Sequence, residues 1–341
     1  MTSSDFLKSQ DYTVGWICAL SLEISAALAM LDEHYSPSSD HSHNPNDINN
    51  YSFGRIGSHN VVITVLPAGV YGTNSAVIVA NCMKYSFGLL RFYLMVGIGG
   101  GAPSAEHDIR LGDVVVSKPG VRHLGVLQYD SGKTGKQGDI AQTGTLNKPP
   151  QEVLTAIAAL EATHRMAENQ IYGMLSDMIA KYPLMQQEFS YQGSKHNALF
   201  KADYHHKDNA RTCKNCDANE AEPRPPRNSN ILVVYYGLIA SGNQVIKDAI
   251  TRNKLRQKFD MLCFEMEAAG LMDNVPCLVV RGICDYLDSH KNNCLQGYAA
   301  ATAAAYAKEL LLRIIARTPS ERVGVINAPP PKVNKLLEQI L

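Results

Sequence analysis

The sequence has no excess of either charge, no long apolar run and no pattern of a secretion signal. Its 341 residues include 32 Lys and Arg against 32 Asp and Glu. Proteins that bind nucleic acid through bulk charge usually carry a basic face, so this balance argues against that class. The longest apolar stretches, such as residues 310–315, are far shorter than the roughly 18 residues of a membrane span. We therefore expect a cytoplasmic protein that is not secreted and that binds neither nucleic acid nor membrane.

Eight cysteines are scattered along the chain, several of them inside apolar runs such as residues 15–20 and 275–280. A chain of this length buries about three quarters of its unfolded surface and needs no disulfide to fold. The cysteines therefore indicate reduced, buried thiols.

Apolar runs rich in β-branched residues alternate with helical patterns along most of the chain. Such alternation predicts a largely parallel sheet covered by helices on both faces. The expected strands are 12–20, 51–56, 61–66, 92–96, 113–117, 125–129, 231–240, 262–264 and 277–283. The expected helices are 21–31, 73–85, 151–182, 243–258, a short one from 267, and 298–315.

Three segments interrupt this pattern. Residues 36–50 are nearly all polar turn formers and predict a loop. Residues 183–230 combine Pro, clustered His and a Cys-x-x-Cys, which predicts an insertion with little regular structure. After residue 317 three consecutive Pro predict a linker that leads to a short amphipathic end.

Carboxylates follow three of the expected strands. Glu23 follows the first strand, Glu265 and Glu267 follow 262–264, and Asp285 follows 277–283. Ligands of open α/β sheets bind beyond the carboxyl ends of the strands, so these acids could share one cleft. Each acid, taken singly, could instead occupy the first turn of a helix and accept its free N–H groups.

A run of glycines at 97–101 could let backbone N–H groups approach a ligand closely, or could form a tight turn at a strand end. Its spacing matches neither G-x-G-x-x-G nor a Walker loop.

Six motifs occur in an order that resembles the nucleoside phosphorylase and nucleosidase superfamily. They are VGWICALSLE (14–23), VGIGGGAP (96–103), LGDVVVS (111–117), GLIASGNQVI (237–246), FEMEAAG (264–270) and RGICDY (281–286). Within the superfamily the chain is most similar to the methylthioadenosine nucleosidase-like members of fungi. Those members stand alone or precede ankyrin, tetratricopeptide or NACHT-type regions, so the chain could work with a signalling region.

The resemblance implies a single-domain, three-layer α/β/α fold with a central mixed, largely parallel sheet. The domain would span 12–317 and contain the insertion 183–230. Residues 1–11 would be an N-terminal extension and 318–341 a Pro-rich tail. Members of the superfamily assemble as dimers, trimers or hexamers, so the resemblance implies a homo-oligomer.

The resemblance also assigns catalytic roles, none of which needs a metal. Cleavage of an N-glycosidic bond needs an acid at the leaving base, a nucleophile at C1′ and partners for the ribose hydroxyls. Asp285 matches the residue that protonates purine N7, and Glu267 matches the ligand of the ribose 2′- and 3′-hydroxyls. Glu23 matches the glutamate that orients the attacking water.

The substrate-binding positions implied by the resemblance lie in four segments. They are Glu265, Met266, Gly99, Gly100, Ser241, Gly242, Asn243, Val245, Ile246 and Cys284. Val245 replaces an aromatic residue that stacks on the base in adenine-specific nucleosidases, which predicts weaker stacking. Cys284 replaces a Ser found in many relatives.

Residues 18–23 contain neither Arg nor Asp-Pro, whereas related phosphorylases hold phosphate with the Arg of a Gly-Asp-Pro-x-Arg-like loop. This favours water as the nucleophile. The leading hypothesis is therefore a purine nucleosidase that releases the base, with adenine preferred, from a nucleoside or a nucleotide such as ATP. A purine nucleoside phosphorylase and a module that senses a nucleoside or nucleotide without turnover are the alternatives.

A 5′-phosphate would need cations, and the insertion offers Lys195, His196, Arg224 and Arg227. A solvated basic face is the simpler interpretation of these residues. The same segment contains His205, His206, Cys213 and Cys216, a set that could hold a structural zinc ion. A loop with two free thiols is the alternative.

Overall fold

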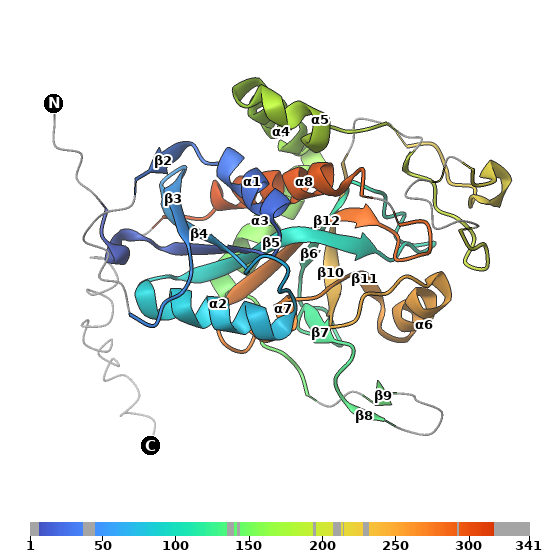
Figure 1. Ribbon diagram of the computed structural model, residues 1–341, viewed down its shortest axis with the longest axis horizontal. Helices are drawn as coiled ribbons and strands as arrows, with labels where there is room; N and C mark the ends of the chain where they lie inside the picture. Colours follow the sequence, from blue (N-terminus) through green and yellow to red (C-terminus); the bar gives the residue numbers. More distant parts are fainter. Residues whose placement is uncertain are drawn as a thin grey trace, which may run out of the picture.

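The computed structural model of the chain describes residues 7–36, 45–134, 140–141, 144–193, 196–206, 213, 215–227, 232–291 and 293–316 (Figure 1). The predicted tail over 318–341, most of the N-terminal extension and Lys195 lie outside the described residues.

A ten-stranded mixed sheet forms the centre of the molecule. Its order is β11, β10, β6, β12, β5, β1, β4, β3 and β2, with β7 paired to β10. The strands are β1 (Val14–Cys18), β2 (Glu33–Tyr35), β3 (Tyr51–Ile56), β4 (His59–Val65), β5 (Phe92–Gly101), β6 (Val114–Ser117), β7 (Val126–Gln128), β10 (Val234–Ser241), β11 (Met261–Glu265) and β12 (Cys277–Asp285). The run from β4 through β1 and β5 to β12 is parallel, whereas β6 pairs with β12 in the antiparallel sense. The predicted mixed, largely parallel sheet is confirmed.

Strand β11 also pairs with the end of β5, in the antiparallel sense, at Gly100 and Gly101. This pairing closes β11, β10, β6, β12 and β5 into a ring. Because the ring closes there, the last residues of β5, β11 and β12 lie next to one another. A separate two-stranded sheet joins β8 (Lys133–Thr134) to β9 (Ile140–Ala141).

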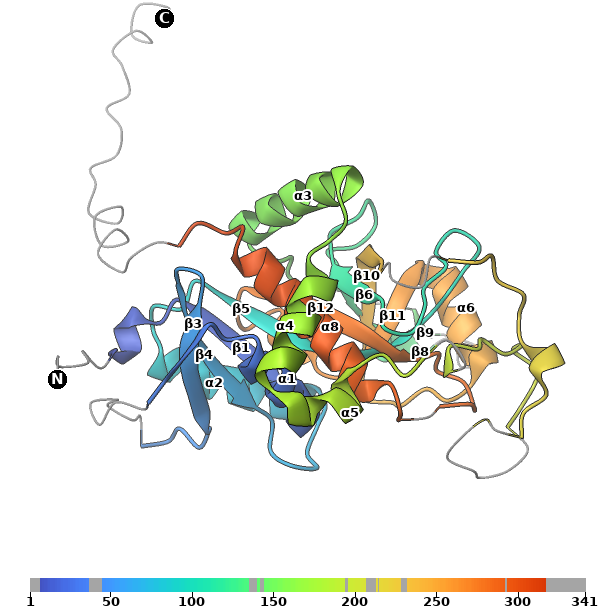
Figure 2. The ribbon, with the colours of Figure 1, turned by 90° about the horizontal axis from the view of Figure 1, so that it is seen from above.

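Helices cover both faces of the sheet. They are α1 (Ser21–Ala29), α2 (Thr73–Ser86), α3 (Gln151–Met166), α4 (Ile171–Lys181), α5 (Gln186–Phe189), α6 (Ala249–Phe259), α7 (Ala268–Leu271) and α8 (Gln296–Leu311). Figure 1 shows α1, α4 and α8 above the sheet and α2 and α7 below it. Figure 2 shows α8 between α1 and α3, with α4 across it, as their packing contacts require. The predicted three-layer arrangement is therefore present.

Alanine lets α8 approach the sheet closely. The helix packs on β5 and β12, and its alanines are buried. A Cβ at Gly282 of β12 would overlap the carbonyl of Ala299, so glycine is required on the strand as well. Small side chains on both partners thus bring the last helix onto the two central strands.

Three predicted elements differ from the structure. The glycine run is not a turn, because β5 continues through Gly101. The helix expected over 151–182 is two helices, and between them the backbone N–H of Gln170 donates to Oε1 of Glu309 on α8 (3.1 Å). The helix expected from residue 243 begins at Ala249, where Asp248 caps it by accepting from the Thr251 N–H (2.8 Å).

The described part of the insertion contains little regular structure. It has α5, two short 3₁₀ turns (Pro183–Met185 and Ala218–Glu220) and an isolated bridge between Phe200 and Ala221. Across the described residues, no helix is both long and apolar enough to pass through a membrane.

Candidate active site

A cavity of about 300 Å³ lies where β5, β11 and β12 end. The predicted residues that line it are Glu23, Gly99, Gly100, Val245, Ile246, Glu265, Met266, Glu267, Cys284 and Asp285. Sequence reasoning missed several others, among them Tyr71, Phe264 and Lys291. The structure thus brings together all of the predicted catalytic acids, from segments more than 250 residues apart.

Glu23 is held by backbone donors on both of its carboxylate oxygens. The N–H groups of Ala19 and Leu20 donate to Oε2 (2.7 and 3.0 Å), and the N–H of Ile98 donates to Oε1 (2.8 Å). Burial raises the pKa of Glu23, and these bonds together with Arg281 only partly offset the rise. Glu23 therefore has both of the roles considered from the sequence. It accepts free N–H groups at the start of α1, and it also lines the cavity. A carboxylate made more basic by burial is suited to accept a proton.

Glu265 and Glu267 share a fully buried arginine. Nη2 of Arg281 forms an ion pair with Oε2 of Glu265 and lies 3.4 Å from Oε2 of Glu267. Glu265 also accepts the backbone N–H groups of Glu267 (3.1 Å) and Ala268 (3.0 Å), which places it at the start of α7. Glu267 has one further, long bond from the N–H of Gly72 (3.4 Å). Glu265 is therefore a supporting group, whereas Glu267 keeps acceptor capacity for a ligand.

Asp285 lies at the end of β12 and contacts a cation. Lys291 Nζ is 3.0 Å from its Oδ2, and the N–H of Leu287 donates to its Oδ1 (3.0 Å). Burial alone would lower the pKa of Lys291, but the Asp285 carboxylate outweighs burial and raises it. The thiol of Cys284, whose pKa is raised by burial and by Asp285, donates to Oδ2 (3.2 Å). The acid predicted to protonate the base is thus paired with an ammonium group.

The glycines of β5 make room for these side chains. A Cβ at Gly97 would overlap the carboxylate of Glu23 and approach Arg281 Nη1 to 2.6 Å. A Cβ at Gly100 would overlap Leu287 and come within 2.9 Å of Oδ1 of Asp285. Glycine is required here because side chains from other elements come close to the strand. The sequence suggested instead that the glycines bring backbone N–H groups near a ligand or form a tight turn.

Only part of the predicted base-binding segment reaches the cavity. Val245 and Ile246 line it, but Ser241, Gly242 and Asn243 do not. The hydroxyl of Ser241 accepts the N–H of Ala269 (2.9 Å), and Oδ1 of Asn243 accepts the N–H of Thr73 (3.1 Å). These two side chains therefore hold α7 and the start of α2 in place.

Two aromatic side chains line the cavity near Val245. Phe264 is buried and packs edge-on against Tyr129 at 5.5 Å between ring centroids. Tyr71 lies in the loop before α2 and is 53% exposed. The cavity therefore has aromatic surface although residue 245 is Val.

The structure does not bring the predicted phosphate cations to the cavity. Nε of Arg224 donates to Oδ1 of Asp108 (2.7 Å), and Nη1 of Arg227 donates to Oδ2 of Asp113 (2.7 Å). Neither arginine nor His196 lines the cavity. These arginines tie the end of the insertion to the segment before β6.

The predicted metal ligands lie apart from this cavity. Donor atoms of His206, Cys213 and Cys216 lie within 4.8 Å of one another, and His205 is not part of that cluster.

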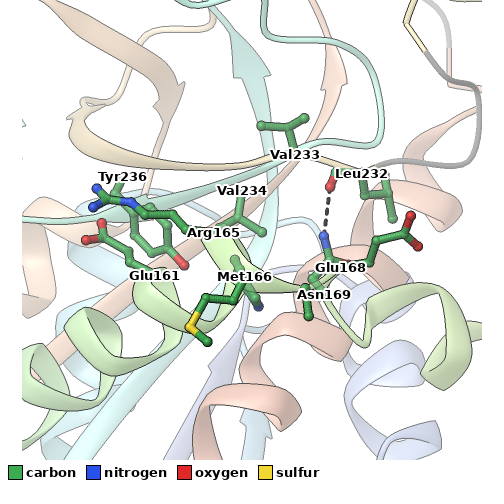
Figure 3. A pocket seen from close by; sticks show the side chains of 11 residues that line it. Glu161, Arg165, Met166, Glu168, Asn169, Leu232, Val233, Val234 and Tyr236 are labelled. Atoms are coloured by element: carbon green, nitrogen blue, oxygen red, sulfur yellow. Dashed lines mark hydrogen bonds between the residues drawn. The ribbon is translucent and has the colours of Figure 1, made fainter.

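A second hollow lies at the amino-terminal end of β10 (Figure 3). It is formed by the end of α3, the turn that follows it and the first residues of the strand, where Nδ2 of Asn169 donates to the carbonyl of Leu232 (2.8 Å). Because ligands of α/β sheets bind at the carboxyl ends of strands, the cavity at Asp285 is the better candidate site.

Glu267 gives the fold a dependence on pH. Burial raises its pKa to about 7, and the carboxylates of Glu265 and Glu23 add to the rise while Arg281 opposes it. The folded state therefore holds this proton at pH values where the unfolded chain has released it. The contribution of Glu267 to the free energy of unfolding is full below the unfolded-chain pKa of 4.5 and is lost as the pH rises to about 7.

We expect Glu267→Gln to remove that decline. Urea denaturation at several pH values between about 5 and 8 should show the stability difference, wild type minus variant, falling as the pH rises. Glu106→Gln, at an exposed glutamate, is the control and should give a constant difference. Parallel curves for wild type and Glu267→Gln would contradict the assignment.

The chain belongs to the phosphorylase superfamily, whose sequence model matches residues 13–316. A nucleotide-binding leucine-rich repeat (NLR)-like protein from Hyaloscypha variabilis is 45% identical over 310 residues, which cover 89% of this chain and 30% of that protein. The ATP nucleosidase Cap17 from Escherichia coli is 36% identical over 86 residues, which cover 24% of this chain and 17% of Cap17. The chain thus spans less than a third of the length of the relatives that it matches.

Solved structures share the fold at low sequence identity. A 5′-methylthioadenosine/S-adenosylhomocysteine nucleosidase from Neisseria meningitidis superposes with a TM-score of 0.54 at 16% identity, over 88% of this chain and 98% of that one. The futalosine hydrolase of Helicobacter pylori superposes with a TM-score of 0.52 at 16% identity, over 88% and 97% of the two chains. The resemblance inferred from the six motifs is confirmed for family and for fold.

Proposed function

We propose that this chain is a purine nucleosidase, which uses water to cleave the N-glycosidic bond and releases the free base. The observation that supports hydrolysis most strongly is the charge of the cavity. Four carboxylates, Glu23, Glu265, Glu267 and Asp285, line it, and Lys291 is the one Lys or Arg among its lining residues. Inorganic phosphate is an anion that needs clustered cations, so this lining favours water over phosphate as the nucleophile.

Each acid has a role that suits its surroundings. Glu23, a carboxylate made more basic by burial, would accept a proton from the attacking water. Glu267 would accept hydrogen bonds from the ribose hydroxyls, because Glu265 takes the larger share of Arg281. Negative charge develops on the leaving base, and Asp285 would pass to it the proton that it shares with Lys291, which neutralises that charge.

The names of the relatives support adenine as the base. One structural neighbour is a methylthioadenosine/S-adenosylhomocysteine nucleosidase and one relative is an ATP nucleosidase. An unphosphorylated nucleoside fits the cavity lining best, because Arg224 and Arg227 are paired with aspartates elsewhere. The similarity to Cap17 makes ATP the second candidate, with Lys291 as the cation that lines the cavity.

The proposal extends to the setting of the enzyme. The chain covers 30% of an NLR-like relative, so we propose that it serves as the nucleoside- or nucleotide-responsive part of a signalling system. Assembly as a homo-oligomer and a cytoplasmic location remain predictions.

Chromatography of the released base is the direct test. The protein is incubated with adenosine, inosine, guanosine, AMP and ATP, each with and without inorganic phosphate. Release of adenine without phosphate is the expected result, and the fastest substrate defines the 5′ group. Release that requires phosphate would make the chain a phosphorylase, and no release from any substrate would favour a sensing module.

The role of Glu23 has its own test. Glu23→Gln keeps the size of the side chain but removes the base, so we expect base release to slow by at least about 100-fold. Binding of adenine, measured by calorimetry, should change far less. Full turnover in this variant would show that another group activates the water.

A further inference from the structure

The insertion carries a compact cluster of metal-ligand side chains outside the active site. One donor atom from each of His206, Cys213 and Cys216 lies within 4.8 Å of the others, and all three residues are partly buried. Donors about 2.1 to 2.3 Å from a tetrahedral zinc ion are separated by roughly 3.5 Å. The three side chains therefore need to move by only about 1 Å to bind one ion.

A fourth cysteine stands on the loop that the cluster contacts. Cys294 is exposed and lies outside the 4.8 Å cluster, four residues after His290 and two residues before α8. Two thiolates from a Cys-x-x-Cys, an imidazole and a third thiolate form a common closed set for structural zinc.

The cluster is attached to the loop between β12 and α8. The thiol of Cys213 donates to the carbonyl of His290 (3.6 Å), and the backbone N–H of His206 donates to Oγ of Ser289 (3.0 Å). The ring of His290 stacks on Phe200 of the insertion at 4.1 Å between centroids. The next residue in the chain is Lys291, which contacts Asp285.

A buried imidazole at this junction lacks a hydrogen-bond partner within the described residues, although Oδ1 of Asp288 lies 3.9 Å from its Nδ1. His290 is 6% exposed, and neither of its ring nitrogens has a hydrogen-bond partner among the described residues. Burying an imidazole without hydrogen bonds costs free energy, so aromatic stacking alone does not explain why the loop between β12 and α8 packs against the insertion. An additional tie between the insertion and the loop would offset that cost.

We propose that His206, Cys213, Cys216 and Cys294 bind one zinc ion, which fastens the insertion to the loop that carries Lys291. The ion is structural, because these four residues would leave no open coordination position and none of them lines the active-site cavity. The four-residue set replaces His205 of the sequence prediction with Cys294. The zinc site does not depend on the proposed function, since its evidence lies wholly outside the cavity.

Metal analysis of the full chain tests the site. After exhaustive dialysis we expect one zinc per chain in the wild type, and a loss of at least about tenfold in metal affinity for Cys216→Ser and for Cys294→Ser. Cys82→Ser is the matched control, because Cys82 is partly buried on α2 and is not a member of the cluster. Cobalt reconstitution should give a thiolate-to-cobalt charge-transfer band in the wild type and in Cys82→Ser, and a weakened band in the other two variants.

Three results would overturn the proposal. They are less than stoichiometric zinc together with no thiolate band, an equal loss of metal in Cys82→Ser, and a Cys213–Cys216 disulfide in the freshly purified protein. His290→Phe keeps the aromatic stacking on Phe200 but removes the imidazole nitrogens. Loss of zinc in this variant but not in Cys294→Ser would identify His290 as the fourth ligand and overturn the assignment of Cys294.

Hydrogen exchange tests the fastening itself. Removal of zinc by a chelator should increase exchange in the peptide that covers 286–296 and leave the exchange of β1 unchanged. Unchanged exchange in that peptide, with zinc demonstrably removed, would contradict a link between the ion and the Lys291 loop. This readout needs no turnover, so it is informative even if the proposed activity fails.

Discussion

Replacing Asp285 by Asn is expected to slow release of the purine base by about 100- to 10,000-fold, the range that one general acid contributes. The carboxylate is 4% exposed, lies in the cavity and pairs with Lys291. Asn keeps the shape and can still accept the N–H of Leu287, so the fold should persist. It can neither donate a carboxylic proton nor hold the ammonium group by charge.

The matched control is Asp288→Asn. Asp288 is a buried acid three residues further along the chain that does not line the cavity, and burial raises its pKa, so its neutralisation costs little. Steady-state rates and thermal unfolding are measured for both variants. Wild-type rates in Asp285→Asn would refute its role, and equal losses in both variants would indicate a disturbance of the loop instead.

Replacing Arg281 by Met is expected to lower the free energy of unfolding by about 3–5 kcal/mol, the usual cost of removing one partner of a buried ion pair. Burial opposes the charge of Arg281, but the carboxylates of Glu265, Glu267 and Glu23 outweigh burial and raise its pKa. Without the guanidinium group these three carboxylates lie in the protein interior with no counter-charge. Base release should fail as well, because Glu23 and Glu267 would then take up protons.

Urea denaturation of Arg281→Met, next to Arg55→Met, measures this effect. Arg55 pairs with Glu33 at the surface, where the two side chains are 36% and 53% exposed, so its removal should change stability little. Adding Glu265→Gln to Arg281→Met should recover part of the loss, since it removes one uncompensated charge. Equal stability of Arg281→Met and the wild type would contradict the importance of this ion pair.

The motif order was sufficient to predict the family, the three-layer fold and the cavity acids. Glu23 comes after β1 and Asp285 ends β12, and both strands run parallel to β5, so their carboxyl ends meet at one edge of the sheet. Glu267 joins them because β11 pairs in the antiparallel sense with the end of β5, a contact that only the folded chain shows. The sequence also placed His206 near the Cys-x-x-Cys, because these residues are close in the chain.

Composition does not report what a side chain contacts. Arg224 and Arg227 have the charge that a phosphate site needs, but Asp108 and Asp113 lie nearer to them in the fold. The resemblance assigns Ser241 and Asn243 to a segment that contacts the base through its backbone, and in the fold their side chains bind the backbone of neighbouring helices.

The sequence by itself determined the alternation of strands and helices, and with it the edge of the sheet where the acids gather. Only the tertiary structure decided how those acids are charged. The closure of β5 onto β11 places Arg281 beside Glu265, and the loop after β12 places Lys291 beside Asp285. Local patterns specify backbone conformation, whereas the charge state of a buried carboxylate depends on distant groups that reach it only after folding.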